Sequence, residues 1–230
     1  MARSMINDLK ALEKSSDFWT RSRDNVVIRY VKRGPVLEVG CGNGMMTKRL
    51  LKKFSVCSTD IDKEGIRLTR KINPNSQLID FTKKIKKPLG KFNTVLMLDS
   101  LEHMKHDEQA LKNANKVLKK NGRVIITVPY HMMFWTKNDA DRSHWRRYSK
   151  KEITKKLSTY GFAVEKIKFW GMMFLIPILL AKLFRFRVPH ESVSDSPMNK
   201  VLYAYMTVEN IIPLPIGSEI ICIARKSKEL

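Results

Sequence analysis

The sequence has few cysteines: its 230 residues include only three, Cys41, Cys57 and Cys222. The number is odd, the three are far apart, and each lies within an apolar run, which argues against a disulfide framework. No two of them have the spacing of zinc-binding cysteines. We therefore expect reduced thiols and a cytoplasmic protein.

Long hydrophobic runs are also absent. The longest uncharged apolar stretch, Phe169 to Ala181, has thirteen residues, whereas a membrane-spanning helix needs roughly 20. Residues 1–14 mix acidic and basic side chains, which is not the pattern of a secretory signal. These features predict a protein that is soluble or lies on a membrane surface.

Acidic residues are scarce: 22 Asp and Glu stand against 44 Lys and Arg, which gives a formal net charge of +22. A field of this strength attracts polyanions, either nucleic acid or an anionic lipid surface. The lysines are scattered along the chain, however, and this pattern favours a lysine-rich proteome as the origin of the charge. No basic strip interleaved with aromatic residues is present, so nucleic acid is the less favoured partner.

Short apolar runs alternate with amphipathic stretches over the first 130 residues. This alternation predicts a doubly wound α/β fold with a parallel sheet. We expect strands over 35–39, 55–59, 77–79, 94–98, 123–128, 162–168 and 219–224, and helices over 5–31, 45–54, 63–71, 107–120 and 149–160, with Asp107 and Ser149 as caps.

A glycine turn follows the first expected strand. Gly40, Gly42 and Gly44 let a nucleotide approach the backbone closely. Glu38 at this turn would repel a pyrophosphate but suits a cationic ligand, and the third glycine comes one residue too early for the dinucleotide motif. Asp60, at the end of the second strand, is placed to accept the hydroxyls of a ribose.

Asp80 and Phe81 follow the third expected strand. They offer a carboxylate for an adenine amine and a ring for the adenine face. Together with the glycine turn and Asp60, they predict a nucleoside-containing, positively charged cofactor.

Four segments together resemble the class I S-adenosylmethionine-dependent methyltransferases, and most closely the type 11, ubiquinone-biosynthesis O-methyltransferase-like set. The resemblance spans about residues 18–168 and rests on the segments 38–44, 58–62, 96–103 and 117–129, which occur in family order. It implies a seven-stranded, mostly parallel Rossmann-like sheet with an antiparallel last strand. The chain would then be one domain: an N-terminal helical cap (1–34), a cofactor-binding core (35–168), an apolar insert or lid (169–218), and the last strand and tail (219–230).

The resemblance also implies which residues bind S-adenosylmethionine. The three glycines would line its methionine and ribose, and Arg23 would pair with its carboxylate. The alternative for Arg23 is an exposed charge on a basic helix. The other positions that match cofactor-binding residues are Glu38, Asp60, Ile61, Asp80, Phe81 and Leu98.

Asp99, Glu102 and His103 fall within one turn after the fourth strand. Two carboxylates and an imidazole suit a divalent ion such as Mg²⁺ or Mn²⁺. Some similar methyltransferases use a metal here, with Glu at the position of Asp99. The alternative is that Glu102 and His103 bond the backbone at a helix start.

The segment 130–148 resembles a type 11 motif, with Asn138 and Ser143 as departures from it. His144 is a candidate general base, assisted by His103, or a further metal ligand, or a histidine that docks a helix. Arg146 and Arg147, with Tyr148, are candidates to bind an anionic group of the acceptor. The alternative for the two arginines is a structural contact with Asp139 or Asp141.

The apolar stretch of the insert has basic neighbours, a profile of an interfacial segment or of a lid over a greasy substrate. We expect peripheral membrane contact through 169–187; the alternative is an ordinary core or dimer surface. Pro177 argues against one long helix. The flanking basic residues are Lys166, Lys168, Lys182, Arg185 and Arg187.

The sequence thus predicts methyl transfer from S-adenosylmethionine to a small, lipophilic or anionic acceptor, at a hydroxyl oxygen. One alternative is 2′-O-methylation of RNA. Another is a non-catalytic cofactor-binding protein associated with membrane glycan or lipid enzymes.

Overall fold

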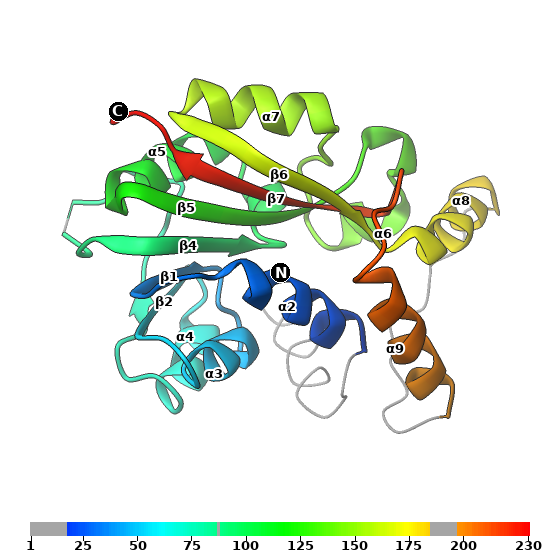
Figure 1. Ribbon diagram of the computed structural model, residues 1–230, viewed down its shortest axis with the longest axis horizontal. Coiled ribbons are helices and arrows are strands. Elements are labelled where there is room, and N and C mark those ends of the chain that lie inside the picture. Colours follow the sequence, from blue (N-terminus) through cyan, green and yellow to red (C-terminus); the bar gives the residue numbers. More distant parts are fainter. Residues whose placement is uncertain (1–17, 87, 185–196) are drawn as a thin grey trace.

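The computed structural model describes residues 18–86, 88–184 and 197–230, and these build one sheet with helices on both faces (Figure 1). The strand order is β3-β2-β1-β4-β5-β7-β6. The strands are β1 (Val36–Val39), β2 (Val56–Asp60), β3 (Gln77–Leu78), β4 (Phe92–Leu98), β5 (Leu118–Pro129), β6 (Phe162–Trp170) and β7 (Glu219–Lys226).

The sheet is mostly parallel, as the sequence predicts. Strands β1 to β5 pair in parallel, and β7 lies antiparallel between β5 and β6. All four residues of β1 are buried, which explains why this strand reads as an uninterrupted apolar run except for Glu38. Because parallel strands end at the same edge, the loops after β1, β2 and β4 lie together.

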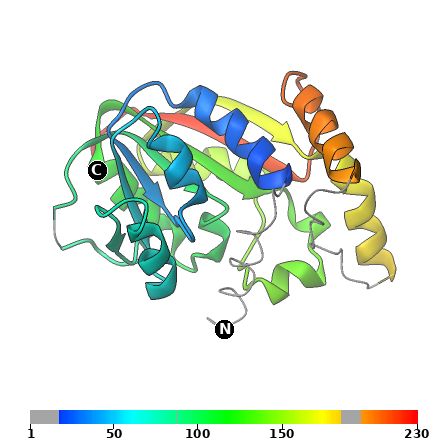
Figure 2. The same cartoon turned by 90° about the horizontal axis from the view of Figure 1, so that it is seen from below.

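Helices cover both faces of the sheet. One core layer lies under α5 (Asp107–Val117) and α7 (Lys150–Thr159), and the other lies under α2 (Phe18–Tyr30) and α3 (Met45–Leu50). Figure 2 shows the second face, where the blue helix α2 crosses the sheet. The remaining elements are α4 (Lys63–Arg70), α6 (Lys137–Asp141), α8 (Leu175–Phe184), α9 (Pro197–Glu209), and the 3₁₀ turns η1 (Leu101–His103), η2 (Met132–Phe134) and η3 (Met172–Phe174).

Several sequence predictions are confirmed in detail, and two are corrected. The Ser149–Glu152 capping box starts α7, and the three cysteines are unpaired. Asp107 does not cap α5; it is the first helical residue, and its carboxylate accepts hydrogen bonds from Lys156. The helix expected over 107–120 ends at Val117 because β5 begins at Leu118. Of the helix expected over 5–31, the part 5–17 lies outside the described residues.

The apolar stretch divides between a strand and a helix. Phe169 and Trp170 complete β6, Gly171 turns the chain with φ 76°, and α8 follows. Pro177 is the third residue of α8, where its missing N–H leaves no helical hydrogen bond unmade. No helix within the described part of the chain is long and apolar enough to cross a membrane.

Buried polar contacts anchor the insert. The Nζ of Lys168 donates to the backbone oxygens of Glu209 and Asn210, at 3.3 and 2.9 Å, and Trp170 donates to the Asn210 side chain at 2.8 Å. A cation at the carboxyl end of α9 also complements the helix dipole. Lys168 is therefore structural, which corrects its assignment to an interfacial basic flank. Arg185 and Arg187 lie outside the described residues.

Candidate functional site

The glycine turn after β1 is tightly enclosed. Gly40 and Gly44 have φ of 80° and 82°. A Cβ at Gly40 would lie 2.8 Å from the Cβ of Ser100, and one at Gly44 would lie 2.9 Å from the hydroxyl of Thr69. A side chain at either position would therefore collide with Ser100 or Thr69, and the positive φ also favours glycine.

Asp60 shapes that turn from the end of β2. Its Oδ2 accepts the N–H of Gly42 at 2.7 Å, and its Oδ1 accepts the N–H of Asp62 at 2.9 Å. Burial raises the pKa of the Asp60 carboxyl. Next to it Ile61 is 65% exposed, so an acid and an uncovered apolar side chain lie together, and their contact with a nucleoside stays a prediction.

The two residues predicted to bind adenine, Asp80 and Phe81, differ in their exposure. Asp80 is partly exposed, and the hydrogen bonds from Thr82 overcome the effect of burial and lower the pKa of its carboxyl. Phe81 is 2% exposed and packs in the core under α5. This corrects the prediction that Phe81 offers its ring to adenine. Leu98, half-buried at the tip of β4, packs against the core layer under α2 and α3, and its contact with the cofactor stays a prediction.

Glu38 lies behind the turn rather than inside it. Its Oε2 accepts hydrogen bonds from the hydroxyls of Thr47 and Ser58. Burial raises the pKa of Glu38 to about 8, against the opposing effect of the Thr47 hydrogen bond. The expectation of a charged acid facing a cationic ligand is therefore corrected: Glu38 is held behind the turn by Thr47 and Ser58, where burial disfavours its charged form.

Arg23 links the N-terminal helix to the end of β4. Its guanidinium donates to Asp24 at 2.9 Å and to Oδ2 of Asp99. Burial opposes the charge of Arg23, but Asp99 and Asp24 outweigh this effect and raise its pKa. The buried Arg23 is thus not the exposed charge of the alternative interpretation, and it lies at the carboxyl edge where a cofactor carboxylate is expected.

The structure also changes the predicted metal set. Asp99 is held by Arg23 and by the hydroxyl of Thr127, which donates to its Oδ1 at 2.6 Å. The ligand atoms that come within 4.8 Å of one another belong to Glu102, His103 and His144. His144 therefore takes the place that the sequence assigned to Asp99.

In this cluster Glu102 is buried, and His103 and His144 are half-buried. Oε2 of Glu102 has no hydrogen-bond partner in the described parts of the chain. Burial and the neighbouring His144 lower the pKa of His103 to about 4, so its imidazole is neutral. The rings of His103 and His144 meet edge to face, with centroids 4.6 Å apart.

Asp139 is a site residue that the sequence indicated only as a possible structural contact of Arg146 and Arg147. Its Oδ1 lies 3.0 Å from Nδ1 of His144, and its two oxygens accept Nε and Nη2 of Arg147 at 2.8 and 3.0 Å. Burial opposes the charge of Asp139, but His144 and Arg147 outweigh it and lower the pKa of the carboxyl. A carboxylate only accepts, so Nδ1 of His144 carries the proton and Nε2 is left as the free acceptor.

The predicted acceptor-binding residues serve the scaffold instead. Arg147 is bound by Asp139 at both oxygens, as the structural alternative states. Tyr148 is 2% exposed and donates to Asp107 at 2.7 Å, and burial raises the pKa of its hydroxyl. Arg146 contacts the same carboxylate at 3.0 Å. These contacts correct the assignment of Arg147 and Tyr148 to an acceptor.

Glu219, the first residue of β7, is a second site residue that sequence reasoning missed. It lies at the same edge because it pairs with Pro129 at the end of β5. Its Oε2 is buried without a hydrogen-bond partner among the residues described. Burial and the nearby Asp99 raise the pKa of Glu219 well above its ordinary value. No motif marks this residue, since only the antiparallel register of β7 brings it to the site.

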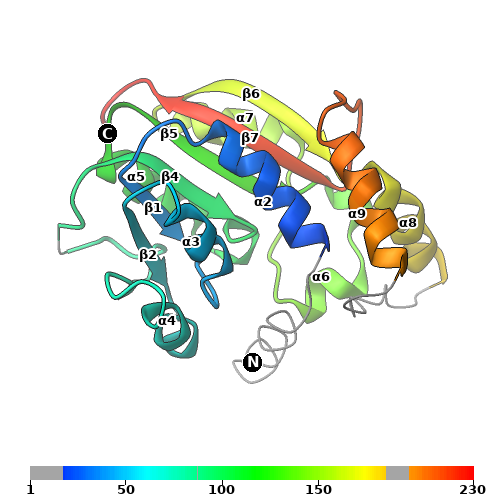
Figure 3. The ribbon, with the colours of Figure 1, turned by 60° about the horizontal axis from the view of Figure 1, so that its bottom comes forward.

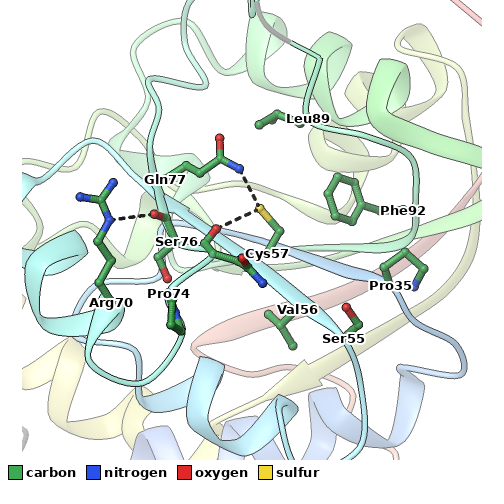
Figure 4. A pocket seen from close by; sticks show the side chains of 11 residues that line it. Pro35, Ser55, Val56, Cys57, Arg70, Pro74, Ser76, Gln77, Leu89 and Phe92 are labelled. Carbon is green, nitrogen blue, oxygen red and sulfur yellow. Dashed lines mark hydrogen bonds between the residues drawn. The ribbon is translucent and has the colours of Figure 1, made fainter.

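A hollow of about 510 Å³ lies at the opposite end of the strands (Figure 4). Pro35, Val56 and Phe92 line it at the starts of β1, β2 and β4, and Arg70 closes one side by donating to the backbone oxygen of Ser76 at 3.0 Å. It is remote from the glycine turn and plays no part in the site described above.

Two observations bear on bound groups. The hydroxyl of Ser100 is buried without a partner in the described chain and lies close to Gly40, so the glycine turn has an unused polar atom beside it, which fits a site for S-adenosylmethionine. The unpaired carboxyl oxygen of Glu102 and the neutral His103 likewise fit a divalent cation. Two imidazoles and one carboxylate suit Mn²⁺, Fe²⁺ or Zn²⁺ better than Mg²⁺.

Comparison with known proteins agrees with this geometry. A family model described as a methyltransferase domain matches residues 16–167. The ubiquinone biosynthesis O-methyltransferase of Pelagibacter ubique is 29% identical over 115 residues, which cover 48% of this chain and 46% of that relative. The chain thus matches about half the length of this curated protein.

Solved structures show the same fold. A methyltransferase of Thermotoga maritima, named as a possible histamine N-methyltransferase, superposes with a TM-score of 0.66 at 16% identity, over 96% of this chain and 95% of that one. One from Archaeoglobus fulgidus has a TM-score of 0.63 at 18% identity, over 92% and 95% of the two chains. Both are described as S-adenosylmethionine-dependent methyltransferases.

Proposed function

Because this chain belongs to the class I S-adenosylmethionine-dependent methyltransferases, we propose that it methylates a hydroxyl oxygen of a small, lipophilic or anionic acceptor. S-adenosylmethionine is the methyl donor of the family. The name of the Pelagibacter relative, an O-methyltransferase, supports oxygen as the atom methylated.

The observation that carries this proposal is the contact between Asp139 and His144. With Nδ1 donating to Asp139, Nε2 is the ring nitrogen of His144 that can accept a proton, in a residue that lies beside His103 and Glu102. In the proposed step Nε2 takes the proton of the acceptor hydroxyl while the oxygen bonds to the methyl carbon. The carbon–sulfur bond breaks, its electron pair stays on sulfur, and the cationic sulfonium becomes a neutral thioether. The carbon is already activated, so positioning supplies most of the acceleration.

The same three residues support a second proposal about the proton. Glu102, His103 and His144 would hold a divalent cation, which would lower the pKa of a hydroxyl bound to it. Treatment with a chelator followed by metal addition separates the two routes. Activity that is lost and then restored by Mn²⁺ supports the cation, and activity that is unchanged supports proton transfer to His144 alone.

The experiment that tests the function measures transfer of a labelled methyl group to a panel containing phenols, amines, fatty alcohols and RNA. We expect transfer to a hydroxyl-bearing small molecule, at least about 10²-fold weaker in His144→Asn. Labelling of amines only contradicts oxygen transfer. Labelling of RNA with a steep salt dependence supports the 2′-O-methylation alternative. Cofactor binding without transfer to any member supports a non-catalytic role.

We also propose a cytoplasmic location, which the three unpaired cysteines support. Fractionation of cells that express a tagged chain tests this proposal. Recovery in an oxidising compartment contradicts it.

A further inference from the structure

Two helices of the insert expose an apolar surface at one end of the molecule. We name it the α8–α9 surface, since α8 and α9 both lie at this end of the molecule, on the right of Figure 1 and Figure 3. Its side chains are 39% to 73% exposed: Ile176, Leu179, Leu180, Leu183 and Phe184 on α8, Val201, Tyr205 and Val208 on α9, and Ile211 and Ile212 directly after it.

The pattern on each helix is that of a contact face. On α8 the positions 176, 179, 180 and 183 form an i, i+3, i+4, i+7 stripe, and on α9 the positions 201, 205 and 208 form another. The inward side is different, since Ala181 and Met206 are 2% and 0% exposed. Stripes of exposed apolar side chains on two helices at one end of the molecule are typical of a binding surface rather than of scattered exposure.

Charge identifies the occupant. In the described part of the insert, 169–184 and 197–218, Glu209 is the sole acidic residue, and it is 3% exposed. Lys182 and Lys200 are exposed on the two helices, and the Arg21 guanidinium stacks on the Tyr203 ring at 4.9 Å. The surface is therefore apolar and cationic, with no uncovered carboxylate among these residues, which matches an anionic lipid bilayer.

Other occupants fit less well. A second copy of the chain would bring two molecules of formal charge +22 together, and like charges repel. Nucleic acid would leave ten exposed apolar side chains without an apolar partner. An anionic bilayer satisfies both the side chains and the charge.

The surface continues to the candidate active site. Lys182 on α8 donates to the backbone oxygen of Met133 at 2.5 Å, and Met132 and Met133 in η2 are 48% and 53% exposed. The chain runs from η2 into α6, which carries Asp139 and leads to His144. A bilayer against α8 would thus border the segment that holds the proposed catalytic histidine.

We propose that the α8–α9 surface docks on an anionic bilayer and brings a membrane-resident hydroxyl compound to the cluster of Glu102, His103 and His144. The docking does not depend on the proposed methyl transfer. Only the delivery of the acceptor rests on it, so the two are tested separately.

The test is flotation of the full chain with vesicles of phosphatidylcholine, alone or mixed with phosphatidylglycerol. We expect binding to the mixed vesicles and little binding to neutral ones. Leu183→Glu with Phe184→Glu should weaken binding at least roughly tenfold, since two side chains then no longer bury apolar area and two anions meet an anionic surface. The matched control, Leu51→Glu with Ile72→Glu, changes the charge equally at two exposed apolar positions remote from the insert.

The outcomes separate the explanations. Loss in the α8 pair with retention in the control pair supports docking, and circular dichroism of both pairs verifies folding. Equal loss in both pairs shows that net charge alone acts and overturns the proposal, as does equal binding to neutral vesicles or none to either. A dimer in light scattering that the α8 pair dissociates assigns the surface to a second copy and also overturns it. The affinity for the cofactor should stay unchanged in all variants, because α8 does not contact the cofactor site.

Discussion

Removing the carboxylate of Asp139 should affect both stability and catalysis. The carboxylate is 1% exposed and holds His144, Arg147 and the start of α6 through Thr136 at 2.8 Å. In Asp139→Ala the Arg147 guanidinium, 9% exposed, loses its bidentate partner. Breaking a buried ion pair on one side costs about 3 kcal/mol or more, and loss of the cap adds about 1 kcal/mol. We expect the free energy of unfolding to fall by about 4 kcal/mol.

Urea denaturation at neutral pH measures this change, with Asp141→Asn on the same helix as the exposed control. A loss below about 1 kcal/mol in Asp139→Ala would refute the buried-pair argument. Asp139→Asn keeps the shape and should lose less stability. Its methyl transfer should still fall at least about 10²-fold, because the amide no longer enforces the tautomer with Nε2 free.

The pH dependence of stability tests the role of Asp139 in a second, independent way. The pKa of Asp139 is lower in the folded chain than in the unfolded one. Its ionisation therefore stabilises the fold above the unfolded value of about 3.9, and the contribution falls as pH drops below that value. The stability difference between the native chain and Asp139→Asn should be constant near neutrality and shrink in acid. A difference that grows in acid contradicts the assignment.

Three further predictions concern the cofactor turn and the buried acids. Gly40→Arg and Asp60→Ala should each abolish the heat of S-adenosylmethionine binding in calorimetry, because one fills the turn and the other removes the carboxylate that shapes it; unchanged binding in both would disprove the site. The pKa of Glu38 is raised to about 8 in the folded chain. Its ionisation therefore favours the unfolded chain as the pH rises from about 4.3 to the folded value. Over this pH range Glu38→Gln should become more stable relative to the native chain, as measured by urea titrations. Glu219→Gln should also become more stable relative to the native chain as the pH rises, because the pKa of Glu219 is raised. The same variant should alter KM for the acceptor and retain its affinity for the cofactor. A stability difference that does not change with pH would contradict the raised pKa.

The sequence predicted the parts of the site that follow from the order of strands and turns along the chain. Gly40, Gly42 and Asp60 follow strands whose apolar runs are unambiguous, and parallel strands bring their ends to one edge. The strand order and the antiparallel β7 agree with the family resemblance. The predictions failed where burial decides the role, since Phe81 and Tyr148 carry the right chemistry but face the core.

The remaining site residues could not be found because tertiary contacts select them. Glu219 reaches the site only through the register of β7 against β5. Arg147 is a plausible anion binder until Asp139 is seen to occupy both of its donor edges. In each case the residue type alone permits two roles. The contact that decides between them is known only once the fold brings the two residues together.

The exchange of Asp99 for His144 in the cluster follows from the other contacts that the Asp99 carboxylate makes. Asp99 has φ 45° at the end of β4, and Thr127 and Arg23 occupy its two oxygens. A carboxylate committed to a buried guanidinium is a poor additional ligand, since Arg23 would then lose one of its two carboxylate partners and keep Asp24. The third ligand atom therefore comes from His144, and its position depends on Asp139. Control of the site thus passes from the end of β4 to the segment from η2 to His144, and its η2 turn also contacts α8. The proposed acceptor chemistry and the proposed membrane docking therefore depend on neighbouring parts of one segment.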